Sequence, residues 1–111
     1  MIFKKKNGSK FEFGGIKGIA ITNKEDIQSG NVAYIEVNGR HGRMKNIAED
    51  RFYFVIEGNG KFFIEGKEFE IEKYDVIVIP KNTVYDYQGK MKLVLFDAPA
   101  FDPSHDVHLD D

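Results

Sequence analysis

Apolar and polar side chains alternate in short runs along the chain, and turn signals separate these runs. The runs are rich in Val, Ile, Phe and Tyr, which favour β-strands, while the intervening Asn-Gly and Gly-Gly pairs favour tight turns. Strands are expected at 10–13, 18–22, 32–37, 51–57, 61–64, 68–71, 75–79, 84–88 and 91–96. One helical turn is expected near 23–28. Many short strands predict an all-β barrel or sandwich.

The run 51–57 is bulky on both of its faces. Side chains alternate across a strand, so one face carries Arg51, Tyr53 and Val55, and the other carries two phenylalanines and an isoleucine. A strand that is apolar on both faces is usually covered on both, here by the barrel interior and by a second sheet or subunit, and a homodimer is therefore expected. The Asn59-Gly60 pair predicts a two-residue hairpin turn into 61–64.

Length and composition fit a single domain over 1–111, with a barrel core of about 10–97 and an acidic tail over 98–111. The chain has 111 residues, 41% of them hydrophobic, and no cysteine, which excludes a disulfide framework and favours a reducing, cytoplasmic location. No apolar run resembles a signal peptide or a membrane span, so no membrane contact is expected. The tail is expected to lie over the barrel through Phe101 and Val107.

Charge is distributed unevenly, although the net charge is only −2. Four lysines lie near the start of the chain: Lys4, Lys5, Lys6 and Lys10. They are interpreted as a solvated strand edge that discourages pairing between molecules, and nucleic-acid binding is not expected. The tail carries His105 and His108 beside Asp102 and Asp106, which suits either a weak surface zinc site or solvated histidines. Solvated histidines are the expectation, because no rigid element fixes a tetrahedral geometry.

Residues 39–89 carry two groups of positions whose spacing is characteristic. The first group runs from Gly39 to Gly58 and includes Lys45, Ile47 and Arg51. The second group holds Tyr74, Pro80, Asn82, Tyr85 and Gly89. In these spacings the chain resembles the cupin family over about half of its length. The resemblance implies a small cupin-type jelly-roll β-barrel, and such barrels remove the exposed strand edges that short strands otherwise leave.

The resemblance also bears on cofactors. A typical cupin binds a divalent metal through two His, a Glu and a further His at four of these positions. Here the four positions hold Lys45, Ile47, Arg51 and Tyr85, and two of them are cations that repel a metal. The resemblance therefore implies a barrel with no metal and no cofactor, and the metal-dependent reactions of the family do not carry over.

If the strands face as the resemblance implies, the interior is cationic and aromatic. Its expected ligand-binding side chains are Lys45, Arg51, Tyr53, Tyr85, Tyr87 and Glu36. Arg51 requires a partner, because taking an unpaired charge out of water is costly. Two partners stay open: an internal carboxylate, with Glu36 and Glu57 as candidates, or the carboxylate or phosphate of an anionic ligand.

Three functions stay open at this point. The first is a metal-independent binding protein for a small anionic or sugar-like ligand. The second is a metal-free carbohydrate-active isomerase, epimerase or lyase. Its proton donor would be Tyr85 or His41, with Lys45 lowering the pKa of Tyr85 and with Lys45 and Arg51 stabilising an enolate. The third is an interaction module with a filled core and no ligand.

Overall fold

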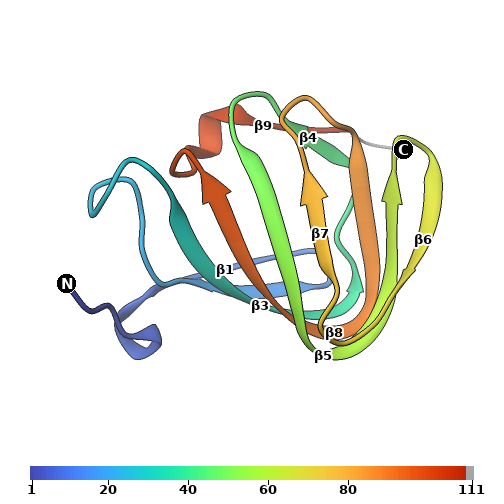
Figure 1. The fold of residues 1–111 in the computed structure, drawn as a ribbon, viewed down its shortest axis with the longest axis horizontal. Coiled ribbons are helices and arrows are strands. Elements are labelled where there is room, and N and C mark those ends of the chain that lie inside the picture. Colours follow the sequence, from blue (N-terminus) through green and yellow to red (C-terminus); the bar gives the residue numbers. More distant parts are fainter. Residues whose placement is uncertain (110–111) are drawn as a thin grey trace.

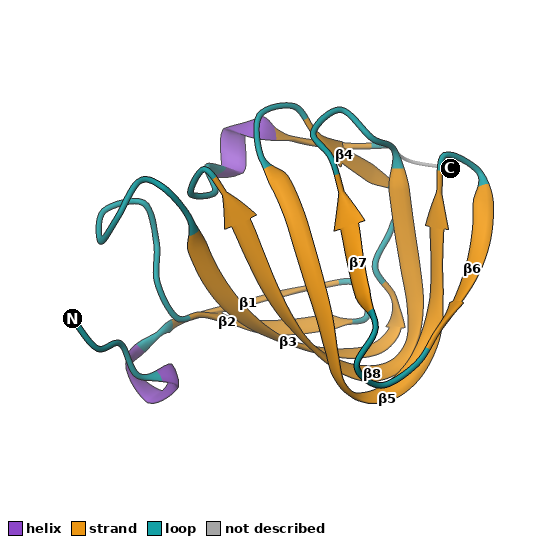
Figure 2. Cartoon of the chain, viewed as in Figure 1, coloured by secondary structure: helices purple, strands orange, loops and turns teal. Residues whose placement is uncertain are grey.

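The computed structural model describes residues 1–109, which form one curled antiparallel sheet (Figure 1). Its strands are β1 (Ser9–Phe13), β2 (Ile16–Ala20), β3 (Asn31–Arg40), β4 (Met44–Asn46), β5 (Asp50–Ile64), β6 (Lys67–Ile71), β7 (Val76–Ile79), β8 (Tyr85–Ala98) and β9 (Asp106–His108). Two short 3₁₀-helices, η1 (Lys5–Asn7) and η2 (Pro103–His105), lie outside the sheet (Figure 2). The predicted all-β barrel is confirmed. No helix of the described residues is long and apolar enough to cross a membrane.

The longest strands, β5 and β8, curve together through the base of the barrel (Figure 1). They pair from Asp50 opposite Ala98 to Ile64 opposite Tyr85. Along its other edge β8 pairs with β3, while β6 and β7 pair with the other edge of β5. Strand β8 therefore joins the β1–β3 part of the sheet to the β5–β7 part.

The Asn59-Gly60 pair lies inside β5, so the predicted hairpin turn at this place is wrong. Asn59 pairs with Lys90 and Gly60 pairs with Gly89 in the ladder between β5 and β8. A Cβ atom on Gly89 would lie 2.6 Å from the Cα atom of Gly60, closer than real Cβ contacts. The glycines therefore let two hydrogen-bonded strands bend in close contact. An Asn-Gly pair in the sequence is compatible with such a bend as well as with a hairpin turn.

The chain reverses after β5 at Glu65 and Gly66, where both residues have positive φ, as a two-residue hairpin requires. Residues 23–28 form a single hydrogen-bonded turn, as expected, and it does not extend into a helix. The Asn23 carbonyl accepts from the amides of Asp26 and Ile27, and its side chain accepts from the amide of Glu25. Asx turns of this kind satisfy the local backbone groups without a helix.

The barrel interior is lined by the inward faces of β2, β3, β4, β5, β7 and β8 and is filled with aliphatic and aromatic side chains. The opposite face of β5, β7 and β8 stays exposed and apolar. We call this set the outer apolar face: Phe52, Phe54, Val76, Val78 and Phe96, each between 37% and 61% exposed. Both faces of β5 are therefore bulky, as the alternation of residues 51–57 indicates.

The segment after β8 crosses the end of the barrel opposite to the bend (Figure 1). Strand β9 pairs with β4, with Met44 opposite His108 and Asn46 opposite Asp106. Of the two expected contacts, Phe101 packs its ring over the guanidinium of Arg51, and Val107 lies in this strand. Two residues of the predicted acidic end, Asp110 and Asp111, lie outside the described residues.

Candidate functional site

Four polar or aromatic side chains meet inside the barrel, at the end that the C-terminal segment covers. Arg51 and Tyr53 are alternate residues near the start of β5, and Tyr85 and Tyr87 are alternate residues at the start of β8. Alternation on a strand turns each pair to the same side. All four are at most 5% exposed.

The guanidinium of Arg51 is paired within the protein. Its Nε donates to Oδ1 of Asp97 at 3.0 Å, its Nη2 donates to Oδ1 of Asp106 at 2.9 Å, and its Nη1 donates to the hydroxyl of Tyr85 at 2.7 Å. Asp97 is on β8 and Asp106 is on β9, so two strands that are distant in sequence supply the carboxylates. Two charge-assisted hydrogen bonds compensate the desolvation of the buried cation.

Neither carboxylate that the sequence suggested for Arg51 is its partner. Glu36 is exposed on the outer side of β3, because Ile35 and Val37 take the inward positions on either side of it. Glu57 is exposed and pairs with Lys92 at 3.2 Å. The prediction of Glu36 as a ligand-binding residue of the interior is therefore wrong.

Lys45 also lies outside the interior. The inward positions of β4 are Met44 and Asn46, both buried, and Met44 contacts Nη1 of Arg51 through its sulfur at 3.9 Å. Because side chains alternate along a strand, Lys45, which lies between Met44 and Asn46, points to the opposite side. The expectation that Lys45 lowers the pKa of Tyr85 is therefore wrong.

The three buried tyrosines form one aromatic wall with Phe62. The hydroxyls of Tyr53 and Tyr85 are 2.8 Å apart, and the ring of Tyr87 stacks on Phe62 with centroids 4.6 Å apart. Burial raises the pKa of all three phenols, and for Tyr53 and Tyr87 it lies well above 10. For Tyr85 the neighbouring Arg51 opposes the effect of burial.

His41 completes this wall from the loop between β3 and β4. Its ring stacks on Tyr87 at 4.4 Å and on Tyr85 at 5.6 Å between centroids, and it contacts Phe13 edge-on. Its backbone amide donates to the carbonyl of Tyr87 at 2.8 Å. Asp86, also buried, accepts from the amide of the next residue, Gly42, at 2.8 Å. Hydrogen bonds thus connect the loop to the first residues of β8.

The protonation of His41 follows from its contacts. Nδ1 lies 2.7 Å from the carbonyl oxygen of Gly42 and donates to it, because a carbonyl oxygen only accepts. Burial lowers the pKa of the imidazole to about 4, so the ring is neutral at pH 7. Nε2 has no hydrogen-bond partner among residues 1–109. Every fully buried polar side-chain atom of these residues has a partner, so Nε2 is not fully buried. Nε2 therefore reaches solvent and carries a lone pair that accepts a proton.

A second buried polar cluster links the C-terminal segment to the barrel, and no local sequence pattern predicts it. Nδ2 of Asn46 donates to Asp106 at 2.9 Å and to Glu49 at 3.1 Å. The other oxygen of Glu49 lies 2.5 Å from Nδ1 of His105. Asp106 and His105 of the tail are thus engaged with Arg51 and Glu49. Within residues 1–109 no three His, Asp or Glu side chains form a group suited to a metal ion.

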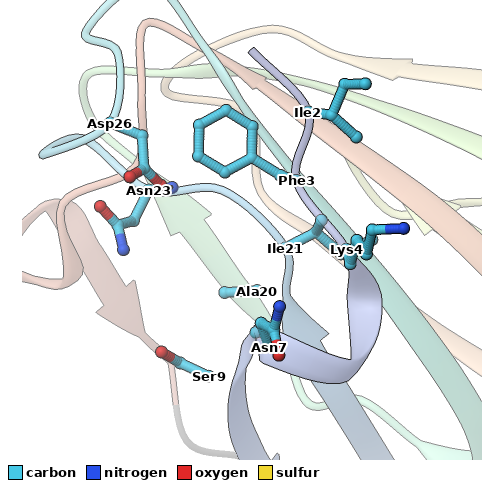
Figure 3. A pocket seen from close by; sticks show the side chains of 10 residues that line it. Ile2, Phe3, Lys4, Asn7, Ser9, Ala20, Ile21, Asn23 and Asp26 are labelled. Carbon is cyan, nitrogen blue, oxygen red and sulfur yellow. Dashed lines mark hydrogen bonds between the residues drawn. The ribbon is translucent and has the colours of Figure 1, made fainter.

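Neither of two surface hollows in the described part of the chain includes a residue of the aromatic wall. One of about 220 Å³ lies beside the N-terminal segment and is lined by residues 2–4, 7–9, 20, 21, 23 and 26 (Figure 3). The other, of about 340 Å³, lies along β6 and β7 and is lined by residues 64, 69–71 and 75–78. The chemistry-bearing side chains and these hollows are therefore separate features.

Two buried groups of the site give the free energy of unfolding opposite slopes with pH. Burial lowers the pKa of His41 from 6.5 to about 4, so between these values the unfolded chain binds the proton more tightly and stability rises with pH. Burial, opposed by Arg51, raises the pKa of Asp97 from 3.8 to about 6, so the folded chain binds that proton more tightly and stability falls as pH rises. Each slope is about 1.4 kcal/mol per pH unit, and the two nearly cancel.

The variant Asp97→Asn is therefore expected to expose the slope of His41. Relative to the unchanged protein, its free energy of unfolding should rise by about 1.4 kcal/mol per pH unit between pH 4 and 6. Urea unfolding of both proteins at several pH values in this interval measures the difference. Parallel pH dependences of the two proteins would contradict the raised pKa of Asp97.

Comparisons with known proteins agree on one fold. The model of the EutQ-like cupin domain matches residues 28–95, more than half of the chain. Pac13, a nucleoside dehydratase, is 25% identical with a TM-score of 0.92 over 99% of this chain and 91% of that chain. Streptomyces PAC13 with a His-to-Gln replacement, solved with uridine, is 25% identical with a TM-score of 0.91 over 97% and 89% of the two chains. No curated protein matches the chain.

KdgF from Halomonas sp. is a more distant structure, 14% identical with a TM-score of 0.78 over 94% of this chain and 97% of that chain. At this identity the likeness concerns the fold alone. It extends over nearly the full length of both chains, so the two chains share the fold as a whole.

Proposed function

The chain belongs to the EutQ-like cupin family, and from this premise and the geometry of its interior we propose that it is a metal-independent lyase, one that eliminates water from a neutral sugar or nucleoside derivative. The resemblance to cupins that the spacings of residues 39–89 indicated is confirmed. Because a fold by itself does not determine function, the proposal rests on the groups of the site. The observation that carries the proposal is the neutral imidazole of His41, stacked on Tyr87, with Nε2 open.

The residues at the usual metal positions do not fit a metal ion. Arg51 places a cation where the family carries a carboxylate, and this cation is held by Asp97 and Asp106. Lys45 lies on the outward side of β4, and Ile47 is 45% exposed and has no ligating atom. A divalent ion would meet a guanidinium at the centre of the site, so no step of the proposed reaction uses a metal.

The charges of the site favour a neutral ligand over an anionic one. Arg51 contributes one positive charge and faces two carboxylates, Asp97 and Asp106, while His41 is uncharged at pH 7. An added phosphate or carboxylate would meet a net negative site in a poorly solvated interior. Aromatic side chains around a largely uncharged interior suit a neutral sugar or nucleoside ring better than an anion. Of the two kinds of ligand that the sequence predicts, anionic and sugar-like, we therefore propose a neutral, sugar-like one.

The chemistry that these groups support is an elimination. Nε2 of His41 takes a proton from a carbon next to a carbonyl, and the C–H electrons form a carbon–carbon double bond as the hydroxyl on the neighbouring carbon leaves. A tyrosine hydroxyl of the wall gives its proton to that hydroxyl, which leaves as water. The phenolate and the imidazolium then return to their starting states by proton exchange through solvent. The net change is loss of one water.

Thermal melting with chosen probes tests the proposed function. Uridine at about 100 times its dissociation constant should stabilise the protein by about 2.7 kcal/mol, and EDTA should leave this effect unchanged. Uridine 5′-monophosphate, which adds two negative charges to the same ring system, is the matched control and should stabilise less. Stronger stabilisation by the phosphate, or loss of the uridine effect in EDTA, would overturn the proposal.

The outer apolar face supports a second, independent proposal, that the protein is a homodimer through this face. Phe52, Phe54 and Phe96 present aromatic surface to solvent on the strands that also form the barrel wall. An isologous dimer would place this surface against its own copy and bury it.

Light scattering at micromolar concentration should therefore give the mass of two chains, and Phe54→Glu should give the mass of one. Glutamate at this position places two charges, one from each copy, in an apolar contact. Ile27→Glu changes an exposed apolar residue outside the face, 46% exposed against 37% for Phe54, and should leave the dimer intact. A single-chain mass for the unchanged protein would refute the dimer.

A further inference from the structure

Three contacts fix the orientation of the Arg51 guanidinium. Asp97 on β8 and Asp106 on β9 accept from two of its three nitrogens, and the ring of Phe101 covers its face with the centroid 5.1 Å away. A planar guanidinium held at two nitrogens has no rotational freedom left for the third. Nη1 is therefore aimed at the hydroxyl of Tyr85, 2.7 Å away.

This contact determines how Tyr85 uses its hydroxyl. A guanidinium has donors and no acceptor, so the Tyr85 oxygen accepts from Arg51. The Tyr53 hydroxyl, 2.8 Å away, is a second neighbour of the same oxygen. A phenolate at Tyr85 would thus lie directly against a permanent cation in an interior where charge is weakly screened.

The other two tyrosines of the wall lack such a contact. No hydrogen bond joins Arg51 to Tyr53 or Tyr87 among the described residues. Burial dominates the environment of both, and their pKa values lie well above that of a solvated phenol. The titratable and charged groups that face Tyr85 are Arg51 and Tyr53 on β5, Tyr87 on β8, His41 in the loop before β4, and Asp106 on β9. Arg51 is the cation among them.

We infer that Arg51 is a positioning residue that acts through Tyr85: it makes Tyr85 the tyrosine that gives its proton to the leaving hydroxyl, and it does not itself bind the ligand. The inference rests on the proposed function, because the elimination supplies the leaving group. In that step the Tyr85 O–H bond breaks, the proton forms water with the departing hydroxyl, and the phenolate stays beside the guanidinium. His41 and Tyr85 then form the base and acid of one aromatic wall.

The order in which the buried tyrosines ionise tests this inference without a substrate. The full chain with ¹³C-labelled tyrosine rings is titrated with alkali, and the ring resonances are assigned with single Tyr-to-Phe variants. Tyr85 is expected to ionise before Tyr53 and Tyr87. Ionisation of either of these before Tyr85 would overturn the inference, and this measurement needs no change at Arg51.

A pair of variants isolates the contribution of the guanidinium. Arg51→Gln is combined with Asp97→Asn, so that no carboxylate is stranded at Nε, and Asp97→Asn alone is the matched control that keeps the guanidinium. The ionisation of Tyr85 should move up by at least one pH unit in the double variant relative to the control. An unchanged ionisation, or loss of uridine binding with unchanged ionisation, would overturn the inference and assign Arg51 to the ligand. Since the titration uses no ligand, a failed uridine melt with the expected titration would refute the proposed function alone.

Discussion

Replacing Arg51 with alanine is expected to lower the free energy of unfolding by about 3–5 kcal/mol, a large part of the stability of a domain this small. The reason is the pair of carboxylates that would remain. Asp97 is 2% exposed, and the side chain of Asp106 is 15% exposed; both lose their charged hydrogen-bond donor in this variant. Urea unfolding at pH 7.5 with a fixed protein concentration measures the loss.

Two further variants show whether stranded charge causes that loss. Adding Asp97→Asn to Arg51→Ala removes one stranded carboxylate and should recover a measurable part of the stability. Lys61→Ala breaks an ion pair with Glu68 in which both side chains are at least 40% exposed, and should cost less than about 1 kcal/mol. If Arg51→Ala is as stable as the unchanged protein, the internal pairing of Arg51 contributes nothing and the cation is available to a ligand.

Replacing His41 with glutamine is expected to slow the proposed elimination by about 10²–10⁴-fold, the usual contribution of a general base. Glutamine retains a side-chain donor of similar length for the Gly42 carbonyl, but it cannot accept a proton at neutral pH. The rate is measured as loss of water, by mass spectrometry, from a uridine derivative that carries a carbonyl on its sugar. Uridine binding by the variant should persist, because the substitution removes the proton acceptor and leaves the tyrosines in place.

The pH dependence of the same rate separates a buried base from a solvated one. Because the pKa of His41 is lowered to about 4, the rate of the unchanged protein should be level from pH 5 to 8 and should fall only below this range. His108→Gln changes an exposed histidine of β9 and is the matched control, with no loss of rate expected. A rate that falls with a midpoint near 6.5 would show that the base is a solvated histidine and not His41.

Strand alternation accounts for the part of this site that the sequence predicts. Arg51 and Tyr53 follow one another at period two on β5, as Tyr85 and Tyr87 do on β8, and the structure buries all four at one end. The spacing of the two groups of positions in residues 39–89 predicts the cupin fold, and the comparisons confirm it. Local patterns therefore predicted which side chains point inward on the long strands.

Long-range register accounts for what the sequence did not predict. Asp97 and Asp106 are 46 and 55 residues from Arg51, and no local pattern tells which strand lies beside β5. On a strand, a shift of one residue moves every side chain to the opposite face. Motif spacing predicts Lys45 as an inward residue of β4, whereas the structure has its neighbour Met44 inward. Taken alone, Asn59-Gly60 predicts a turn. In the structure its pairing with β8 keeps both residues inside a continuous, bent strand.

The place of β8 in the sheet has a consequence for vectorial synthesis on the ribosome. Strand β8 lies between β3 and β5 but follows both in the chain, so the strands made first have no shared partner until residues 85–98 emerge. Until then the inner sides of β3 and β5 face water, and the guanidinium of Arg51 is hydrated. Arrival of β8 brings Asp97 beside it and joins both parts of the sheet in one step. Nascent chains that end before β8 therefore expose apolar surface and unpaired strand edges, which chaperones recognise.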